Sequence, residues 1–310
     1  ATNFSSTNAG ISITDTLPSQ LQAVANTAVG GTISSDLKTV SFQGSLTPAP
    51  NISVTTGASP AGGYLNLGAA PYNVPPIPGV GDETITTFGV PAYTYAGESY
   101  TRLSVDSNGY LIVGGGTTNA FINQNLPDPA PPNNVLAPWW TDLFPGTGGG
   151  GNIYIAEVIN TTTGSKWIVV DYNAVMETGT TKADSFEVWI GEGTTQDISY
   201  AYGPLGGNGT GGLLTVGAED KFGTRGQNYY FKGLTGTAVG TLPTSTTQLV
   251  VASGTGAPTE SHTITFDAVR VQPGKWINYV HMTSDQFQGI EVFAAPWPVK
   301  PLFLPVILRH

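Results

Sequence analysis

The fold is decided by residues 132–203, whose informative runs are PNNVLAPWWTDLFP (132–145), NIYIAEV (152–158), KWIVVDYNAV (166–175), DSFEVWIGEG (184–193) and DISYAYG (197–203). These runs are short, alternate apolar with polar residues, and are rich in Val, Ile, Tyr and Trp. Gly, Pro and Asn separate them. This pattern is typical of antiparallel strands with one face on a core and the other in water. The stretch therefore predicts an all-β fold.

The composition of the 310-residue chain agrees with that prediction. Its 41 Gly and 23 Pro suit a β protein with many turns, and its 39% hydrophobic content argues against a disordered chain. Charged residues make up only 10% of the chain, and its net charge is −10. Eleven Lys and Arg do not make a basic surface, so we expect no nucleic-acid partner and no attraction to anionic membranes. There is no Cys, which excludes disulfides and thiolate chemistry.

Similar strand patterns flank the central stretch. GISITDT, KTVSFQGSL and NISVTT lie within residues 1–56, and a Pro-rich loop crosses residues 57–82. The run SYTRLSVDSNGYLIVGG (99–115) predicts a hairpin with Asn108-Gly109 as its two-residue turn, in which Asp106 caps the turn. Strand patterns return over residues 247–296. No run is long and apolar enough to predict a membrane-spanning helix.

The first segment resembles a domain repeated in bacterial cell-surface proteins, a family with no assigned function. The resemblance rests on Asp15-Thr16-Leu17-Pro18 after a strand and on a later turn, Leu46-Thr47-Pro48-Ala49, in which Ala replaces the usual Gly. The second half of that repeated domain is matched best by HTITFDAVRVQPGKWINYVHMTS at 262–284. The resemblance implies an immunoglobulin-like sandwich built discontinuously from residues 1–56 and 247–297. Residues 57–246 would then be an inserted antiparallel β domain, and residues 298–310 a separate tail strand.

Residues 53–296 resemble the C-terminal, non-catalytic region of secreted bacterial subtilisin-like proteases, with a pattern similar to nidogen-type β domains. The matching motifs include PNNVLAPWWTDLFP, FEVWIGEG and GLLTVGAEDKFGTRGQNYY. This resemblance implies an extracellular accessory module. It implies no protease activity, because the catalytic domain is absent from these residues.

Candidate site residues each have a structural interpretation as well as a functional one. Trp139, Trp140 and Asp142 form a candidate ligand face for a sugar ring or a calcium ion. Adjacent residues of a strand face opposite sides, however, so the structural interpretation buries one indole in the core and places the other as a lid. His262 and His281 lie on neighbouring predicted strands, but two histidines do not make a metal site. We therefore expect no catalytic residues, no cofactor and no metal.

Four Asn-x-Ser/Thr triplets are candidate glycosylation sites, at Asn3, Asn51, Asn160 and Asn208. Several such triplets are expected by chance in a chain rich in Thr and Asn.

The tail carries apolar side chains on both of its faces, at Leu302, Phe303, Leu304, Val306, Ile307 and Leu308. Burial of six such side chains is worth on the order of 10 kcal/mol before entropy costs. Pro301 and Pro305 cannot donate ladder hydrogen bonds, so an edge or groove position is favoured over a central strand. The tail can pack on its own domain, complete the sheet of another copy by strand donation, or attach the chain to a membrane or cell wall.

These observations predict a non-enzymatic, extracellular or cell-surface protein. Its leading function is structural: copies of the chain assemble through β edges and terminal strands, as in a filament or surface layer. The alternative is an accessory module that grips substrate or polysaccharide for a secreted subtilisin-like protease.

Overall fold

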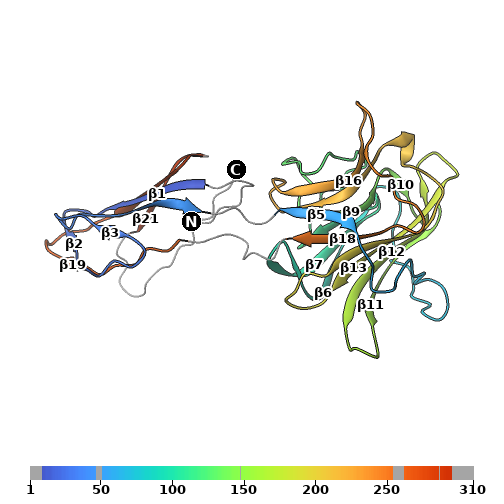
Figure 1. Cartoon of the computed structure of the whole chain (residues 1–310), viewed down its shortest axis with the longest axis horizontal. Helices are drawn as coiled ribbons and strands as arrows, with labels where there is room; N and C mark the ends of the chain where they lie inside the picture. The colour runs from blue at the N-terminus through green and yellow to red at the C-terminus, as the bar shows by residue number, and fades with distance from the viewer. Residues whose placement is uncertain (1–8, 47–50, 147, 254–261, 286, 295–310) are drawn as a thin grey trace. The chain divides into compact units, whose positions relative to one another are not determined.

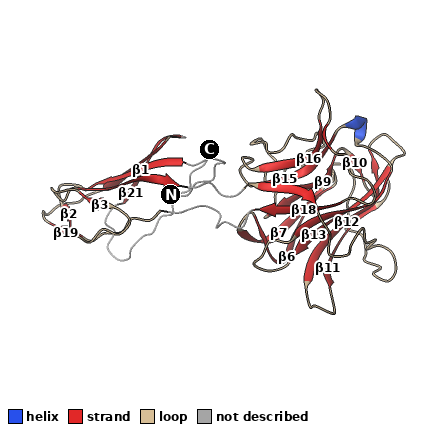
Figure 2. Cartoon of the chain, viewed as in Figure 1, coloured by secondary structure: helices blue, strands red, loops and turns tan. Residues whose placement is uncertain are grey.

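The computed structural model describes residues 9–46, 51–146, 148–253, 262–285 and 287–294. Nearly all regular structure within these ranges is strand, and their one helical element is the three-residue turn η1 (Thr210–Gly212), as Figure 2 shows. The prediction of an all-β fold is confirmed. The chain divides into two compact units, one formed by residues 1–49 and 256–310 and the other by residues 50–255.

The smaller unit brings the two ends of the described chain into one antiparallel sheet. The sheet has the order β21-β20-β1-β4-β3, and β2 and β19 form a separate pair. Its strands are β1 (Ala9–Thr16), β2 (Leu21–Ala23), β3 (Thr32–Ile33), β4 (Thr39–Leu46), β19 (Ala268–Arg270), β20 (Asn278–Ser284) and β21 (Phe287–Ala294). Ile11 of β1 lies opposite Ser284 of β20. A small core of Leu17, Leu21, Ala23 and Val40 lies in this unit, and its assignment to the immunoglobulin-like fold stays a prediction.

The boundary between the units differs from the one expected from the sequence. The sequence pattern places strands β5 (Ile52–Thr56) and β18 (Gln248–Ser253) in the smaller unit, but they pair with each other at one side of a sheet of the larger unit (Figure 1). The reason is their apolar residues. Val54 and Val251 lie opposite each other and are both buried in the larger unit's core.

The larger unit contains two antiparallel sheets. One has the order β10-β12-β13-β14-β18-β5, with β11 also paired to β12, and the other has the order β17-β16-β15-β9-β8-β7-β6. The strands of the first sheet not yet given are β10 (Leu143–Phe144), β11 (Asn152–Ile159), β12 (Lys166–Glu177), β13 (Ala183–Gly191) and β14 (Ile198–Leu205). Those of the second are β6 (Ile85–Tyr95), β7 (Glu98–Asp106), β8 (Leu111–Val113), β9 (Val135–Trp140), β15 (Leu214–Glu219), β16 (Gly226–Lys232) and β17 (Val239–Gly240).

The two sheets share one hydrophobic core, to which both contribute large, fully buried side chains. Tyrosine hydroxyls cross this core and donate hydrogen bonds to the backbone of the opposite sheet. Tyr172 of β12 donates to the carbonyl of Asp106 at 2.7 Å. Tyr202 of β14 donates to the carbonyl of Pro138 at 2.8 Å. A buried hydroxyl needs a partner, so these bonds fix the spacing and alignment of the sheets while the rings fill the core.

The hairpin between β7 and β8 is present, but its turn is one residue longer than expected. The amide of Asp106 donates to the carbonyl of Tyr110 at 3.0 Å, which leaves residues 107–109 as a three-residue loop. Gly109 has a φ of 78°, whereas Asn108 is not among the residues with positive φ. A two-residue type I′ turn requires positive φ at both positions, so a three-residue loop that ends in glycine forms instead. Asp106 caps the turn as expected, since its Oδ1 accepts from the amide of Asn108 at 2.9 Å.

Gly109 is a position where we expect substitution to be costly. A Cβ on this residue would lie 2.1 Å from the carbonyl oxygen of Trp139, in addition to the strain of the positive φ. Gly109→Ala should therefore lower the free energy of unfolding by about 2 kcal/mol or more, measured by urea denaturation. Gly179→Ala is the matched control, because Gly179 has a φ of 71° but no atom within 4 Å of the added methyl group. Equal losses in the two variants would contradict the role of the contact with Trp139.

Candidate functional site

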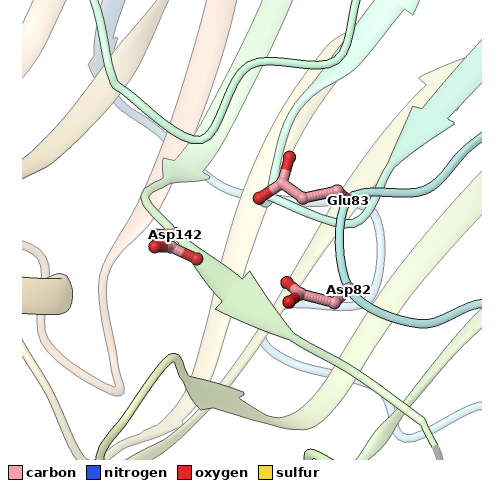
Figure 3. Close-up of side chains that lie close together, drawn as sticks. All are labelled: Asp82, Glu83 and Asp142. Carbon is pink, nitrogen blue, oxygen red and sulfur yellow. The ribbon is translucent and has the colours of Figure 1, made fainter.

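Three acidic side chains converge at one corner of the larger unit. Asp82 and Glu83 precede β6, and Asp142 lies between β9 and β10, so the cluster joins segments about 60 residues apart (Figure 3). One carboxylate oxygen from each residue lies within 4.8 Å of the others. Asp82 and Glu83 are exposed, and Asp142 is partly buried. Among the described residues, this is the group whose oxygens are spaced closely enough to share one cation.

The buried side chain of Asn108 positions this acidic corner. Its Nδ2 donates to Oε2 of Glu83 at 3.2 Å, and its Oδ1 accepts from the amide of Leu143 at 3.0 Å. The hairpin loop thus holds both segments that carry the acids. Glu83 itself has a φ of 48°, in the left-handed region. Its side chain is therefore placed by the local fold and by Asn108 together.

The electrostatics of the corner disfavour three simultaneous negative charges. Loss of solvation around its carboxyl raises the pKa of Glu83, the hydrogen bond from Asn108 opposes this shift, and the charges of Asp142 and Asp82 add to it. A hard cation would relieve this repulsion, because carboxylate oxygens are the ligands that Ca²⁺ prefers. Ca²⁺ takes six to eight oxygens, however, and three carboxylates alone do not form such a shell.

The candidate ligand face of Trp139, Trp140 and Asp142 is not present as a surface. Both indoles are completely buried. Trp139 lies in the core shared by the two sheets, and Trp140 lies in a separate cluster on the other face of β9. The alternation of side chains along a strand explains this, since it sends adjacent residues to opposite faces. Only Asp142 remains accessible, and it contributes to the acidic corner.

Two fully buried carboxylates, which sequence reasoning missed, attach the loop of residues 57–82 to the sheet. Asp171 of β12 and Glu187 of β13 lie directly opposite each other. Oδ2 of Asp171 accepts from the amide of Leu67 at 3.0 Å, and Oε2 of Glu187 accepts from the amide of Leu65 at 2.9 Å. Leu67 is itself fully buried beneath this loop. The two acids therefore replace the backbone partners that an irregular segment lacks.

Burial raises the pKa of both carboxyls. The pKa of Glu187 rises to about 9, with the charge of Asp171 as the second cause, and the pKa of Asp171 rises to about 7. Like charges directly opposite on neighbouring strands are destabilising. At neutral pH Glu187 is therefore protonated, which removes that repulsion.

A second loop is held in the same way. Oδ1 of Asp184 accepts from the amides of Gly206 and Gly207, at 2.9 and 3.0 Å. Oε1 of Glu177 accepts from the amide of Gly209 at 2.5 Å. Both carboxylates are buried, and burial raises the pKa of each. The interior acids of this unit thus act as partners for loop backbone.

The remaining predicted positions are dispersed. Asn51, Asn160 and Asn208 are exposed, while Asn3 and the tail residues 302–308 lie outside the described residues. His281 lies on β20, and His262 stacks on Phe42 with ring centroids 3.5 Å apart. The described residues include no helix with the length and apolarity that a bilayer crossing requires.

Comparison with known proteins identifies the larger unit. A family model described as NIDO related matches residues 80–268, which is more than half of the chain. No curated protein and no solved structure shows significant similarity to the chain. The matched region includes both sheets of the larger unit except β5, together with all three residues of the acidic corner.

Proposed function

The chain belongs to the NIDO-related family, whose domains are extracellular β-rich modules, and we propose that it is a non-enzymatic structural subunit whose copies assemble through a sheet edge and the terminal strands. The observation that carries this proposal is the edge of the smaller unit. In the described chain, β21 pairs with β20 on one side and with no strand on the other. The open side of this eight-residue edge strand offers backbone donors and acceptors to an incoming strand.

Comparison with β6 supports the choice of this edge. β6 is also an edge strand, but it contains Pro91, its register shifts between Gly89 and Tyr93, and Tyr93 forms a bridge with Glu192. Proline and bulges are devices that block pairing at an edge. The β21 sequence FQGIEVFA contains no proline and a single charge, and its one register shift against β20 lies at its start, between the pairs Ser284–Phe287 and Met282–Ile290. Residues 290–294 pair with β20 without interruption.

The C-terminal tail, residues 298–310, is the candidate for the incoming strand. Residues 302–308 carry six apolar side chains around Pro305. Transfer of such side chains from water to a protein interior lowers the free energy. Proline is tolerated in a strand that pairs along one side. We propose that the tail of one copy adds to a sheet edge of another, and that the assembly works at the cell surface.

Removal of residues 298–310 tests this proposal. We expect the full chain to form oligomers whose mass increases with protein concentration and the shortened chain to be monomeric, as measured by light scattering coupled to size exclusion. Phe303→Asp should weaken association as well, because a charge would be buried in the interface. His310→Asp is the matched control at the polar end of the tail and should assemble normally.

Two results would contradict the proposal. If full and shortened chains are both monomers of equal stability, the tail has no role in assembly. If both are monomers but the shortened chain is less stable, the tail packs on its own domain.

The alternative function, an accessory binding module of a secreted protease, requires an accessible ligand surface. Trp139 and Trp140 do not provide one, because both are completely buried. That function would therefore depend on a different surface of the larger unit.

A further inference from the structure

A groove of about 280 Å³ opens on the larger unit between the loop of residues 57–82 and the strands β11, β12 and β13. Its main lining residues are Leu65, Tyr72, Ile159, Asn160, Trp167 and Trp189. Aromatic rings therefore occur on both sides of it: Tyr72 comes from the loop, and the two indoles come from the sheet. None of the side chains that line it is charged.

The two indoles of the groove are held in fixed orientations. Nε1 of Trp167 donates to Oδ2 of Asp197 at 2.9 Å, and Nε1 of Trp189 donates to Oε2 of Glu187 at 3.1 Å. The rings meet edge to face, with centroids 6.1 Å apart and an interplanar angle of 70°. Their polar atoms are thus occupied within the protein. Trp189 is only 2% exposed and supports Trp167, whose partly buried ring supplies the accessible part of this wall of the groove.

The opposite wall is also anchored. The loop is tied to the sheet by the amide of Leu65, which donates to Glu187, and by the amide of Ile77, which donates to the carbonyl of Ile153 at 2.8 Å. Tyr72 of this loop remains 43% exposed. The groove is therefore formed before any ligand arrives, which lowers the entropy cost of binding.

Asn160 gives the rim of the groove a hydrogen-bonding group. Its Oδ1 accepts from the amides of Thr162 and Thr163, at 2.9 and 3.1 Å, which fixes the orientation of the side-chain amide. Its Nδ2 donates no hydrogen bond to the residues that the structure describes, so it is available to an acceptor on a ligand. A binding site that combines apolar walls with a few placed polar groups is the usual form of a small-ligand site.

We propose that this groove binds one ring of a neutral saccharide. A pyranose ring has apolar C–H faces, which suit Tyr72 and Trp167, and hydroxyl groups at its edge, which suit Asn160. The uncharged lining offers no counter-charge to an ionic ligand, and the net charge of −10 disfavours anionic sugars. This inference goes beyond assembly, since it uses a different unit of the chain and none of the tail.

The test is binding of the full chain to an array of neutral oligosaccharides of glucose, galactose, mannose and N-acetylglucosamine. The protein is produced in a host without N-glycosylation, so that no sugar attached at Asn160 can fill the groove. We expect binding to at least one of these series, with an affinity that falls tenfold or more in Trp167→Ala and in Tyr72→Ala. Tyr72 lies on an exposed loop, so its variant reports on binding even if Trp167→Ala folds poorly.

Phe121→Ala is the matched control, because Phe121 is an aromatic side chain that is 50% exposed and does not line the groove. It should bind as the unaltered protein does, and so should the chain without residues 298–310. The inference is overturned if the unaltered protein binds none of the array, or if Tyr72→Ala and a folded Trp167→Ala both retain full affinity. Loss of assembly in the shortened chain has no bearing on this result.

Discussion

Glu187→Gln should flatten much of the pH dependence of stability between pH 5 and pH 9. The folded protein keeps the Glu187 proton up to a pKa of about 9, whereas an unfolded chain releases it near the ordinary value for Glu. Between these two values the unfolded state binds fewer protons than the folded state, so the free energy of unfolding falls as the pH rises. The limiting slope is about 1.4 kcal/mol per pH unit for one such group.

A glutamine at position 187 has no proton to lose, and its carbonyl oxygen can still accept from Leu65 and Trp189. Urea denaturation at pH 5, 7 and 9 measures the effect. The unaltered protein should be most stable at pH 5. As the pH rises, its free energy of unfolding should fall relative to that of Glu187→Gln by about 1 kcal/mol per pH unit. Part of the dependence should remain, since burial also raises the pKa of Glu219 to about 8 and that of Asp106 to about 7.

Glu157→Gln provides the control for charge removal alone. Glu157 lies on β11, which is separated from β13 by β12, and forms an exposed ion pair with Lys166, with an N–O distance of 2.8 Å. Exposed pairs of this kind contribute less than about 1 kcal/mol, so the pH profile should stay close to that of the unaltered protein. Identical profiles for Glu187→Gln and the unaltered protein would show that Glu187 is ionised in the folded state at neutral pH, against the present interpretation.

Trp139→Ala should lower the free energy of unfolding by about 3–5 kcal/mol. The indole is completely buried and packs against Phe186 and Tyr202, with ring centroids 6.3 and 6.0 Å away. Its removal leaves a cavity between two sheets whose alignment is fixed by tyrosine hydrogen bonds, so the walls cannot easily move together. Denaturant unfolding monitored by far-ultraviolet circular dichroism measures the loss without relying on the deleted fluorophore.

Phe121→Ala serves as the comparison, because this exposed ring should contribute within about 0.5 kcal/mol. A Trp139→Ala variant that is as stable as the unaltered protein would contradict the burial of this residue and restore it as a surface group.

The strand class was predictable because alternation is a local signal. The pattern around Trp139 and Trp140 also indicated that their rings lie on opposite faces, which the structure bears out. The burial of the second ring was not predictable, since it depends on a loop that brings the carbonyl of Ala120 within 2.7 Å of the Trp140 Nε1. A local sequence pattern cannot predict a contact between residues 20 positions apart in a strand and a loop.

The same limit applies to the acids. Asp171 and Glu187 were not singled out, because an acidic residue in a strand is usually exposed, and the loop that covers them lies more than 100 residues away in the sequence. The acidic corner joins Asp82 and Glu83 to Asp142 through the side chain of Asn108, and the sequence pattern indicates a candidate site residue only at Asp142. The spacing of these acids along the chain does not indicate that they lie close together in the fold.

The register of β5 and β18 determines how the larger unit would respond to a pulling force. Ile52, near the start of this unit, lies directly opposite Ser253, near its end. A force that pulls residues 52 and 253 apart would act directly on this antiparallel pair. It would break the hydrogen bonds between β5 and β18 one after another, starting at this end. Resistance of that kind is weak, whereas the tyrosine-bridged sheets behind it would bear no load until β5 and β18 had separated.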